Sequence, residues 1–282
     1  MNLLSINSHV ACGHVGNAAA VFALQRLGCE VWPVHTVLFS NHPGHGSFRG
    51  EMVEASAVRE LSRGIEDRGL FARCDGVLSG YVGKAETGEA ILETAAKVKA
   101  ANPAARYCCD PVIGDAGRGV YVRAGIPEFL RERALPAADV LTPNQFELEH
   151  LSGGATPTLA ALLAAIDALA ARGPRVILVT SVATEETPKD CIDLVAAERG
   201  GRFRLRTPRL PVAVHGAGDA IAALFFLRWF RAGSAAEALS RAASSIFGVL
   251  RRTAEAGADE MLLIDAQEEL IRPSRMFLAE PV

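Results

Sequence analysis

Short apolar, β-rich runs alternate with longer alanine-rich stretches of helical period along almost the whole chain, and this alternation constrains the fold more than any other feature. Strands that are buried on both faces appear as continuous apolar runs, and parallel strands must be joined by crossover connections. The alternation therefore predicts an α/β fold in which a mostly parallel central sheet lies between two layers of helices. The expected strands are residues 3–6, 30–34, 76–78, 106–109, 140–141 and 176–180, and the expected helices are residues 16–27, 51–68, 85–100, 126–133, 159–171 and 236–254.

One segment breaks the alternation. Residues 191–196 and 202–207 flank a Glu-Arg-Gly-Gly turn, and this pattern predicts a β-hairpin that gives the sheet an antiparallel edge. Arg202, Arg204 and Arg206 alternate with apolar residues, so they share one face of the second strand. We interpret that face as solvated rather than as a phosphate site.

Length and charge limit the possible roles of the chain. Its 282 residues are 50% hydrophobic, which suffices for one large core, and we expect a single domain over residues 1–282. The net charge is −3 without a long block of one sign, so we expect no nucleic-acid partner. The first residues lack a signal-peptide pattern, and the longest apolar run in the C-terminal third, residues 220–230, is about half the roughly 20 residues of a membrane span. We therefore expect a cytoplasmic protein without a membrane partner.

Cysteines and histidines show no metal-binding spacing. The six cysteines include no C-x-x-C pair, so reduced thiols are expected, and the reactivity of Cys12 stays open. Five histidines crowd the first third of the chain, but none forms an H-x-x-x-H pair, which favours structural or substrate-contacting roles over metal binding: His9, His14, His35, His42 and His45.

Two common nucleotide-binding motifs fail on spacing. Gly83-Lys84 resembles the end of a phosphate-binding P-loop, but Leu78 stands where the earlier glycine is required and Ala85 where Ser or Thr is required. The first strand is followed by G-x-x-G alone, which does not make a dinucleotide-binding fingerprint.

The strongest chemical pattern is His215-Gly216-Ala217-Gly218-Asp219-Ala220, which leads directly into an apolar helix expected over residues 221–230. Glycines at a helix start let backbone N–H groups converge on an anion, and we expect positive φ at both Gly216 and Gly218. A carboxylate in the same turn, Asp219, is suited to accept the proton of an attacking hydroxyl as phosphoryl transfer begins. The alternative is an ordinary helix entry with Asp219 as the N-cap.

A second group of polar residues follows two neighbouring strands. Asp110 comes directly after residues 106–109, and a Thr-Pro-Asn-Gln-Phe-Glu segment that ends at Glu147 comes directly after residues 140–141. Ligands of open α/β sheets bind at the carboxyl ends of the strands, so both carboxylates are candidates to hold Mg²⁺ on a triphosphate. Taken alone, each could equally be a helix cap or a surface charge.

Taken in order, these motifs resemble those of the ribokinase-like superfamily, and the stretch Ser-Ile-Asn-Ser-His-Val at residues 5–10, with Gly-His-Val-Gly-Asn at 13–17, resembles the pyridoxal kinases in particular. Further motifs of that family follow in the same order: Phe39-Ser40-Asn41-His42, Leu78-Ser79-Gly80-Tyr81, Cys109-Asp110-Pro111-Val112-Ile113-Gly114-Asp115, Thr142-Pro143-Asn144-Gln145-Phe146-Glu147 and Thr180-Ser181. The resemblance covers nearly the whole chain. It implies a ribokinase-like three-layer sandwich and ATP-dependent phosphorylation of the 5'-hydroxyl of pyridoxal.

The resemblance also implies roles for individual residues. Asp219 matches the catalytic base, and Gly216, Ala217 and Gly218 match the anion hole; Pro43 and Ala217 replace hydroxyl residues that relatives carry. Positions around the pyridine ring are matched by Ser8, Val15, Phe39, His42, Pro43 and Tyr81. Positions of the nucleotide and cation site are matched by Asp110, Asp115, Tyr121, Thr142, Asn144, Glu147, Thr180 and Ser181, with residues 115–121 as a lid and Asp110 and Glu147 near the metal.

The family's cofactors and assembly are implied in the same way: Mg²⁺, a monovalent cation (K⁺ or Na⁺), ATP as co-substrate and a homodimer. Two other functions stay open. A hydroxymethylpyrimidine kinase would share the fold, the glycine turn and the base, whereas a non-catalytic protein that binds pyridoxal phosphate or ATP would be expected to lose the base or the turn.

Overall fold

A mostly parallel sheet forms the centre of the computed structural model, which describes residues 1–282. Its strands are β1 (Asn2–Val10), β2 (Glu30–Phe39), β3 (Gly50–Met52), β4 (Gly76–Ser79), β5 (Arg106–Cys109), β8 (Val140–Leu141), β9 (Val176–Val182), β10 (Cys191–Glu198), β11 (Gly201–Pro208) and β12 (Glu280–Pro281). Their order across the sheet is β12-β11-β10-β9-β8-β5-β4-β1-β2-β3. The pairs from β2 to β9 are parallel, and β3, β10, β11 and β12 are antiparallel to their neighbours.

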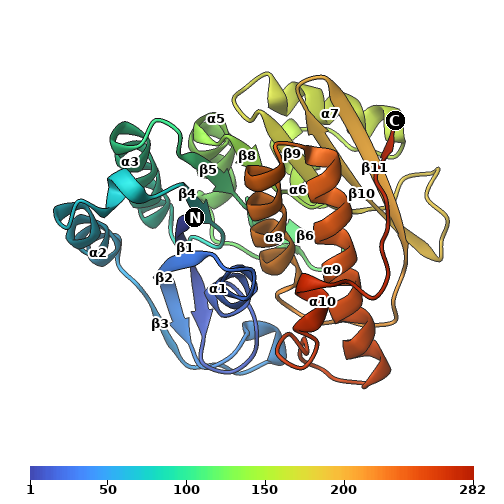
Figure 1. Cartoon of the computed structure of the whole chain (residues 1–282), viewed down its shortest axis with the longest axis horizontal. Coiled ribbons are helices and arrows are strands. Elements are labelled where there is room, and N and C mark those ends of the chain that lie inside the picture. The colour runs from blue at the N-terminus through green and yellow to red at the C-terminus, as the bar shows by residue number, and fades with distance from the viewer.

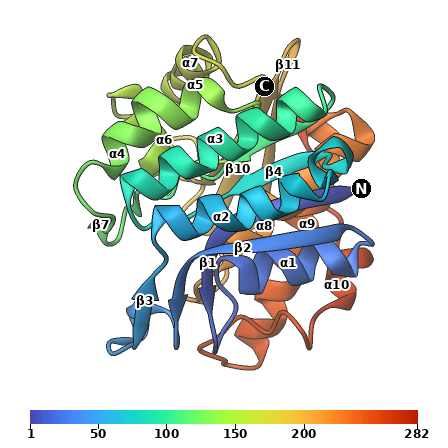
Figure 2. The ribbon, with the colours of Figure 1, turned by 90° about the vertical axis from the view of Figure 1, so that its left-hand side faces the viewer.

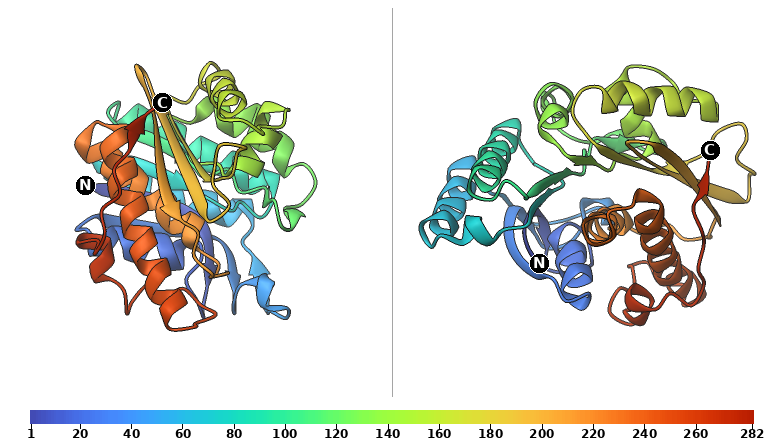
Figure 3. Two further views of the ribbon diagram at one scale, coloured as in Figure 1. Left: turned by 90° about the vertical axis from the view of Figure 1, so that its right-hand side faces the viewer. Right: turned by 45° about the horizontal axis from the view of Figure 1, so that its top comes forward.

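Helices cover both faces of the sheet, which gives the three layers seen in Figures 1 and 2. One face carries α1 (Asn17–Arg26), α8 (Ala217–Ala232), α9 (Ala235–Glu255) and α10 (Glu268–Ile271). The other carries α2 (Ala55–Asp67), α3 (Ala85–Ala101), α4 (Ile126–Phe129), α5 (Leu135–Ala137), α6 (Gln145–Ser152) and α7 (Leu159–Ala170). Figure 3 shows the same separation from the side and from above.

Two hydrophobic clusters, one on each face, explain why the strands are unbroken apolar runs in the sequence. In β9, Val176 and Leu178 belong to the cluster under α8 and α9, whereas Ile177 and Val179 belong to the cluster under α6 and α7. All four side chains are almost completely buried. Successive side chains of the strand therefore point alternately into one core and the other. Neither face of the central strands meets water, so both sets of side chains are apolar.

The predicted edge hairpin is confirmed, and the sheet continues beyond it. β10 and β11 pair antiparallel over residues 191–208, and the chain ends by adding β12 to their outer edge. Arg202 forms an ion pair with Asp167, and Arg206 forms one with the buried Asp193. Two of the three hairpin arginines thus pair with carboxylates of the chain.

Some boundaries differ from the sequence-based expectation. The helix expected over residues 51–68 begins only at Ala55, because Glu51 and Met52 pair with β2 at the sheet edge as β3. The helix expected over residues 126–133 is a composite of α4, a π-helical turn η3 (Leu130–Ala134) and α5. No helix combines the length and apolar character that crossing a bilayer would require.

A small hairpin outside the main sheet was not expected. β6 (Gly114–Asp115) and β7 (Gly119–Val120) pair antiparallel in the segment between β5 and α4. Asn144, the N-cap residue of α6, donates from Nδ2 to the carbonyl of Gly114 at 2.8 Å, which fastens the base of the hairpin. The hairpin contributes residues to the cavity described next.

Candidate active site

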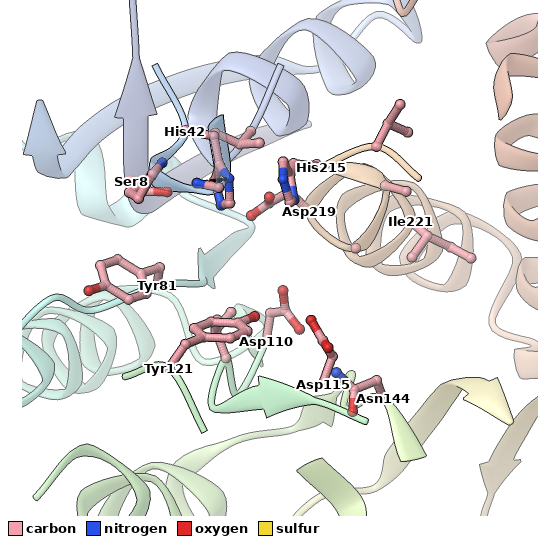
Figure 4. A pocket seen from close by; sticks show the side chains of 18 of the residues that line it. Ser8, His42, Tyr81, Asp110, Asp115, Tyr121, Asn144, His215, Asp219 and Ile221 are labelled. Carbon is pink, nitrogen blue, oxygen red and sulfur yellow. Dashed lines mark hydrogen bonds between the residues drawn. The ribbon is translucent and has the colours of Figure 1, made fainter. Parts of the chain in front are cut away.

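A cavity of about 580 Å³ opens where the carboxyl ends of the central strands meet the start of α8, and 26 residues line it. All the site residues predicted from the sequence lie on its wall: Ser8, Val15, Phe39, His42, Pro43, Tyr81, Asp110, Asp115, Tyr121, Thr142, Asn144, Glu147, Thr180, Ser181, Gly216, Ala217, Gly218 and Asp219. Figure 4 shows side chains from both ends of the chain converging on this space. The structure thus brings the two predicted groups of residues into one site.

The glycine turn before α8 differs in detail from the expectation. Gly216 is the N-cap residue and has φ of 88°, and a Cβ at this position would collide with the carbonyl oxygen of His14. Gly218, by contrast, does not have positive φ, because it lies within the first turn of α8. The expectation of positive φ at Gly218 is therefore wrong. A Cβ there would meet no atom within 4 Å, so Gly218 leaves space on the cavity wall.

Asp219 lies in the first turn of α8 and does not cap it, so the N-cap interpretation is wrong. Its Oδ1 accepts a hydrogen bond from Nδ2 of Asn7 at 2.9 Å. Oδ1 of Asn7 accepts from the backbone N–H groups of Ser8 at 2.8 Å and Tyr81 at 2.9 Å, and these bonds fix which end of the amide faces Asp219. Burial raises the pKa of Asp219, while hydrogen bonds from Gly16 and Asn7 oppose the rise.

Asn7 is a site residue that the sequence analysis did not single out. It is 2% exposed at the end of the buried part of β1, and it connects β1, the segment after β4 and the start of α8. A buried amide needs hydrogen-bond partners, and Asn7 finds them in these three segments.

Asp110 directly follows β5 and is 8% exposed on the floor of the cavity. The hydroxyl of Thr142 donates to its Oδ1 at 3.1 Å. Burial raises the pKa of Asp110 well above its usual range, and the nearby charges of Glu147 and Asp219 raise it further. No positively charged side chain pairs with this carboxyl group, so a cation would be stabilised beside it.

Glu147 closes the start of α6 in a capping box with Asn144. Its Oε2 accepts from the N–H of Asn144 at 2.9 Å, and Asn144 Oδ1 accepts from the N–H of Glu147. Oε1 accepts from the N–H groups of Ile113 at 2.9 Å and Gly114 at 3.4 Å. The cap alternative is therefore confirmed for Glu147. Its burial is the largest cause of its raised pKa, and three backbone donors stabilise the charge.

The donor set fits a hydrated divalent cation better than an all-protein cage. No group of three or more His, Cys, Asp or Glu side chains in the chain is placed to hold a metal ion. Mg²⁺ is commonly held by one or two carboxylates together with waters and substrate phosphates. Asp110 offers an unpaired carboxylate for this, and Glu147 could act only through the oxygen lone pairs that its backbone donors leave free.

The β6–β7 hairpin forms the side of the cavity opposite α8. Asp115 accepts from the backbone N–H groups of Gly117 at 3.0 Å and Arg118 at 2.8 Å, and its carboxylate pairs with the Arg118 guanidinium at 2.6 Å. The guanidinium also lies over the ring of Tyr121, 5.1 Å from its centroid. These contacts hold Arg118, a cavity residue missed by the sequence analysis, at the rim.

A wall of aromatic and imidazole rings lies on the side of β1 and β2. The rings of His42 and His215 are 3.7 Å apart between centroids. Burial lowers the pKa of His42 to about 4, and the neighbouring His215, Arg118 and His45 contribute to the decrease. His215 begins the glycine-turn pattern of the sequence, but it was assigned no role from the sequence, and the structure places it on the cavity wall.

A smaller, mostly apolar pocket of about 260 Å³ adjoins the cavity. The two share Thr180, Ser181, Ala217, Gly218 and Ile221 on their walls. Ser181 is the one non-glycine residue with positive φ, at 54°. Beyond the shared wall the pocket is lined mainly by residues of β10, the segment after β11 and α9: Ile192, Leu194, Thr207, Pro208, Arg209, Leu210, Val212, Ala243, Ile246, Phe247 and Leu250.

Comparison with known proteins agrees with this geometry. The sequence model of the family described as phosphomethylpyrimidine kinase matches residues 23–263. Pyridoxal kinase PdxY of Granulibacter bethesdensis is 54% identical over 284 residues, covering 99% of each chain, and that of Corynebacterium diphtheriae is 48% identical over the full length of both. The solved pyridoxal kinase of Leishmania donovani in complex with ADP and pyridoxamine superposes with a TM-score of 0.91 at 28% identity, covering 100% of this chain and 99% of that one.

The fold and the family match define the class: the chain is a kinase of the ribokinase-like fold in the phosphomethylpyrimidine kinase family. Within that class, full-length identities of 40–54% to curated relatives show that it belongs to the pyridoxal kinases.

Proposed function

We propose that this chain transfers the γ-phosphoryl group of ATP to the 5'-hydroxyl of pyridoxal, giving pyridoxal 5'-phosphate. The observation that carries the proposal is the position of Asp219 in the first turn of α8. It lines the same cavity as the aromatic side chains and the carboxylate of Asp110. The curated relatives named pyridoxal kinase support the substrate, and the Leishmania enzyme's complexes with ADP support the nucleotide.

In this mechanism the pyridine ring lies against the wall formed by Ser8, Val15, Phe39, His42 and Tyr81, all of which line the cavity. A flat aromatic substrate suits apolar and aromatic side chains, and the few polar groups fix its orientation. Pro43 lies beside His42 and offers no hydroxyl or N–H to a ligand.

The 5'-hydroxyl is then directed toward Asp219, which takes its proton as the oxygen attacks phosphorus. Asn7 holds Oδ1 of the carboxylate in place, and a carboxylate has enough lone pairs to accept the hydroxyl's hydrogen bond as well. The first N–H groups of α8 have no partner within the helix, and together with the helix dipole they stabilise the negative charge of the transferring group.

The nucleotide occupies the side of the cavity near Thr142, Asn144, Thr180 and Ser181, and its base enters the adjoining apolar pocket. Asp110 and Glu147 are the residues that would hold a hydrated Mg²⁺, and the ion would supply positive charge to the triphosphate. Asp115 and Tyr121 belong to the hairpin that covers the phosphates. The requirement for a monovalent cation and the homodimer rest on the family resemblance and belong to the same proposal, as do a cytoplasmic location and the action of residues 1–282 as one kinase domain.

The test is a substrate panel. Purified protein with Mg-ATP is given pyridoxal, pyridoxine, pyridoxamine or hydroxymethylpyrimidine, in K⁺ or Na⁺, while ADP release and the phosphorylated product are both followed. The proposal requires turnover of pyridoxal. Turnover of hydroxymethylpyrimidine alone would favour the other activity suggested by the family description, and binding without turnover of any substrate would favour a non-catalytic protein.

A further inference from the structure

Three histidines from two distant parts of the chain meet beside the cavity, and two of them, His42 and His215, line it. His42 and His45 lie in the connection between β2 and β3, and His215 lies just before α8. His42 and His215 stack with an interplanar angle of 31°, and His45 meets His215 edge-on at 5.6 Å between centroids. Nε2 of His45 is bound to Oε1 of Glu260 at 2.9 Å, which ties the loop to the segment after α9. Figure 4 shows the stacked rings beside Asp219.

The protonation state of His42 follows from one hydrogen bond. Its Nδ1 accepts from the backbone N–H of Gly44 at 3.0 Å, as the cap of the short helix η1 (Pro43–His45). A backbone N–H can only donate, so Nδ1 must keep its lone pair. The neutral ring therefore carries its proton on Nε2, and protonation of Nδ1 would break the bond to Gly44. His42 is left with an N–H donor for a ligand.

Gly44 is what allows this arrangement. A Cβ at residue 44 would collide with Nε2 of His215 and lie 2.8 Å from Nδ1 of His42. The loop can therefore approach the two rings closely only because it carries glycine there. Gly44 donates to Nδ1 of His42 and also packs against the ring of His215. A change in either ring therefore disturbs the position of the other.

Several charged or titratable groups surround the stacked pair. Arg118 and Asp115 reach it from the β6–β7 hairpin, and Arg118 lowers the pKa of both imidazoles. Burial is the largest cause for each ring. The remaining groups on packed elements are His45 on the same loop, Glu260 after α9, Tyr121 after β7 and Asp219 on α8.

We propose that His215 is a positioning residue that holds His42 as a neutral imidazole, so that Nε2–H of His42 donates to an oxygen substituent of the substrate's pyridine ring. This inference rests on the function proposed above, and it adds a specificity determinant from outside the recognised motifs. It explains why the wall of aromatic and imidazole rings presents a donor, Nε2–H of His42, whose ring keeps the same charge near neutral pH. Oxygen substituents of the ring accept such a bond, whereas an ammonium group cannot.

The test compares the parent with His215→Ala and His215→Phe, with His150→Ala as the matched control because His150 lies outside the cavity. Loss of one neutral hydrogen bond predicts a rise of about threefold to tenfold in KM for pyridoxal in His215→Ala, with kcat and KM for ATP nearly unchanged. The acid limb of kcat/KM moves to higher pH, because His42 loses a stacked neighbour that helps to keep it neutral. His215→Phe keeps a flat ring and recovers most of the affinity, and His150→Ala behaves as the parent.

A second measurement needs no variant in position 215. Imidazole ¹⁵N spectra of the parent, with the His42 signals assigned by their loss in His42→Gln, should show the Nε2–H tautomer from neutral pH down to about pH 5.5, a unit below the ordinary histidine pKa. A cationic or Nδ1–H ring at pH 6.5 overturns the proposal. So does an active parent whose His215→Ala variant keeps both its KM for pyridoxal and its acid limb. An inactive parent contradicts the proposed function instead, and the two failures are thereby distinguished.

Discussion

Gly216→Ala and Gly218→Ala are expected to affect stability in opposite directions although both should reduce catalysis. At Gly216, φ of 88° costs a residue with a Cβ about 1 to 2 kcal/mol, and the collision with His14 O adds to this. At Gly218 the helical backbone carries no such cost, and alanine is up to about 1 kcal/mol better than glycine inside a helix. Gly216→Ala should lower the free energy of unfolding by at least about 2 kcal/mol. Gly218→Ala should leave it unchanged or raise it slightly.

Urea unfolding, followed by the fluorescence of the chain's two tryptophans, measures these changes, and steady-state kinetics with pyridoxal measures catalysis. The methyl group that Gly218→Ala introduces would stand in open space on the wall where the transferring phosphoryl group is proposed. Alanine keeps the backbone N–H, but its methyl group would hold the phosphoryl group away from donors that are each worth about 10²- to 10³-fold in kcat, so we expect Gly218→Ala to lose about tenfold or more without loss of stability. Parent-like kcat in a stable Gly218→Ala variant would refute the placement of the phosphoryl group at this turn.

Three further predictions follow from the site and the sheet. Asp219→Asn should keep the fold and both substrate affinities but lose about 10²- to 10⁴-fold in kcat, and a loss under tenfold would mean that the base lies elsewhere. Asp110 has a raised pKa in the folded protein, so its ionisation lowers stability as pH rises from the unfolded pKa of about 4 through the folded one. In EDTA, Asp110→Asn should flatten that decline in melting temperature, and an unchanged pH slope would contradict this. In a separate assay with Mg²⁺ present, Asp110→Asn should raise KM for Mg-ATP about 10- to 100-fold. Arg206→Leu leaves the buried Asp193 without its cation and should cost about 3 to 5 kcal/mol in urea unfolding, whereas Arg204→Leu on the same strand, which has no ion pair, should change stability by less than about 1 kcal/mol.

Strand positions could be predicted from the sequence because burial on both faces leaves a strong local pattern. The runs at residues 106–109 and 140–141 coincide with β5 and β8, and the hairpin at residues 191–208 was marked by its turn. β3 could not be predicted, because its three residues are mostly exposed and are strand only through pairing with β2. Helix α6 was not among the helices expected from the sequence, although Asn144 and Glu147 have the spacing of a capping box, because its eight residues are too few to show a clear helical period.

The candidate site was predictable to the extent that its residues lie in compact motifs at strand ends. Asn7, Arg118 and His215 lie within stretches named in the sequence analysis, but they were assigned no role there, because each acts through contacts with distant segments. Asn7 binds Asp219 across 212 positions, and His215 meets His42 only after the sheet has brought β2 beside the start of α8. The conformation of Gly218 was wrongly predicted for a related reason: sequence does not indicate which glycine of a G-x-G turn ends the loop and which begins the helix.

The three carboxyl groups of the site link the proposed base to the cation proposed beside Asp110. Asp110, Glu147 and Asp219 all have a raised pKa, chiefly through burial, and the charges of Glu147 and Asp219 both act on Asp110. A base must be ionised to take a proton, yet each of these charges disfavours the others in a site of low dielectric. A divalent cation beside Asp110 would reverse the sign of the local field and favour the ionised form of Asp219. Binding of Mg-ATP would therefore prepare the base as well as deliver the phosphoryl group, so the pH at which kcat/KM for pyridoxal reaches half its maximum should be lower at saturating Mg-ATP than at limiting Mg-ATP.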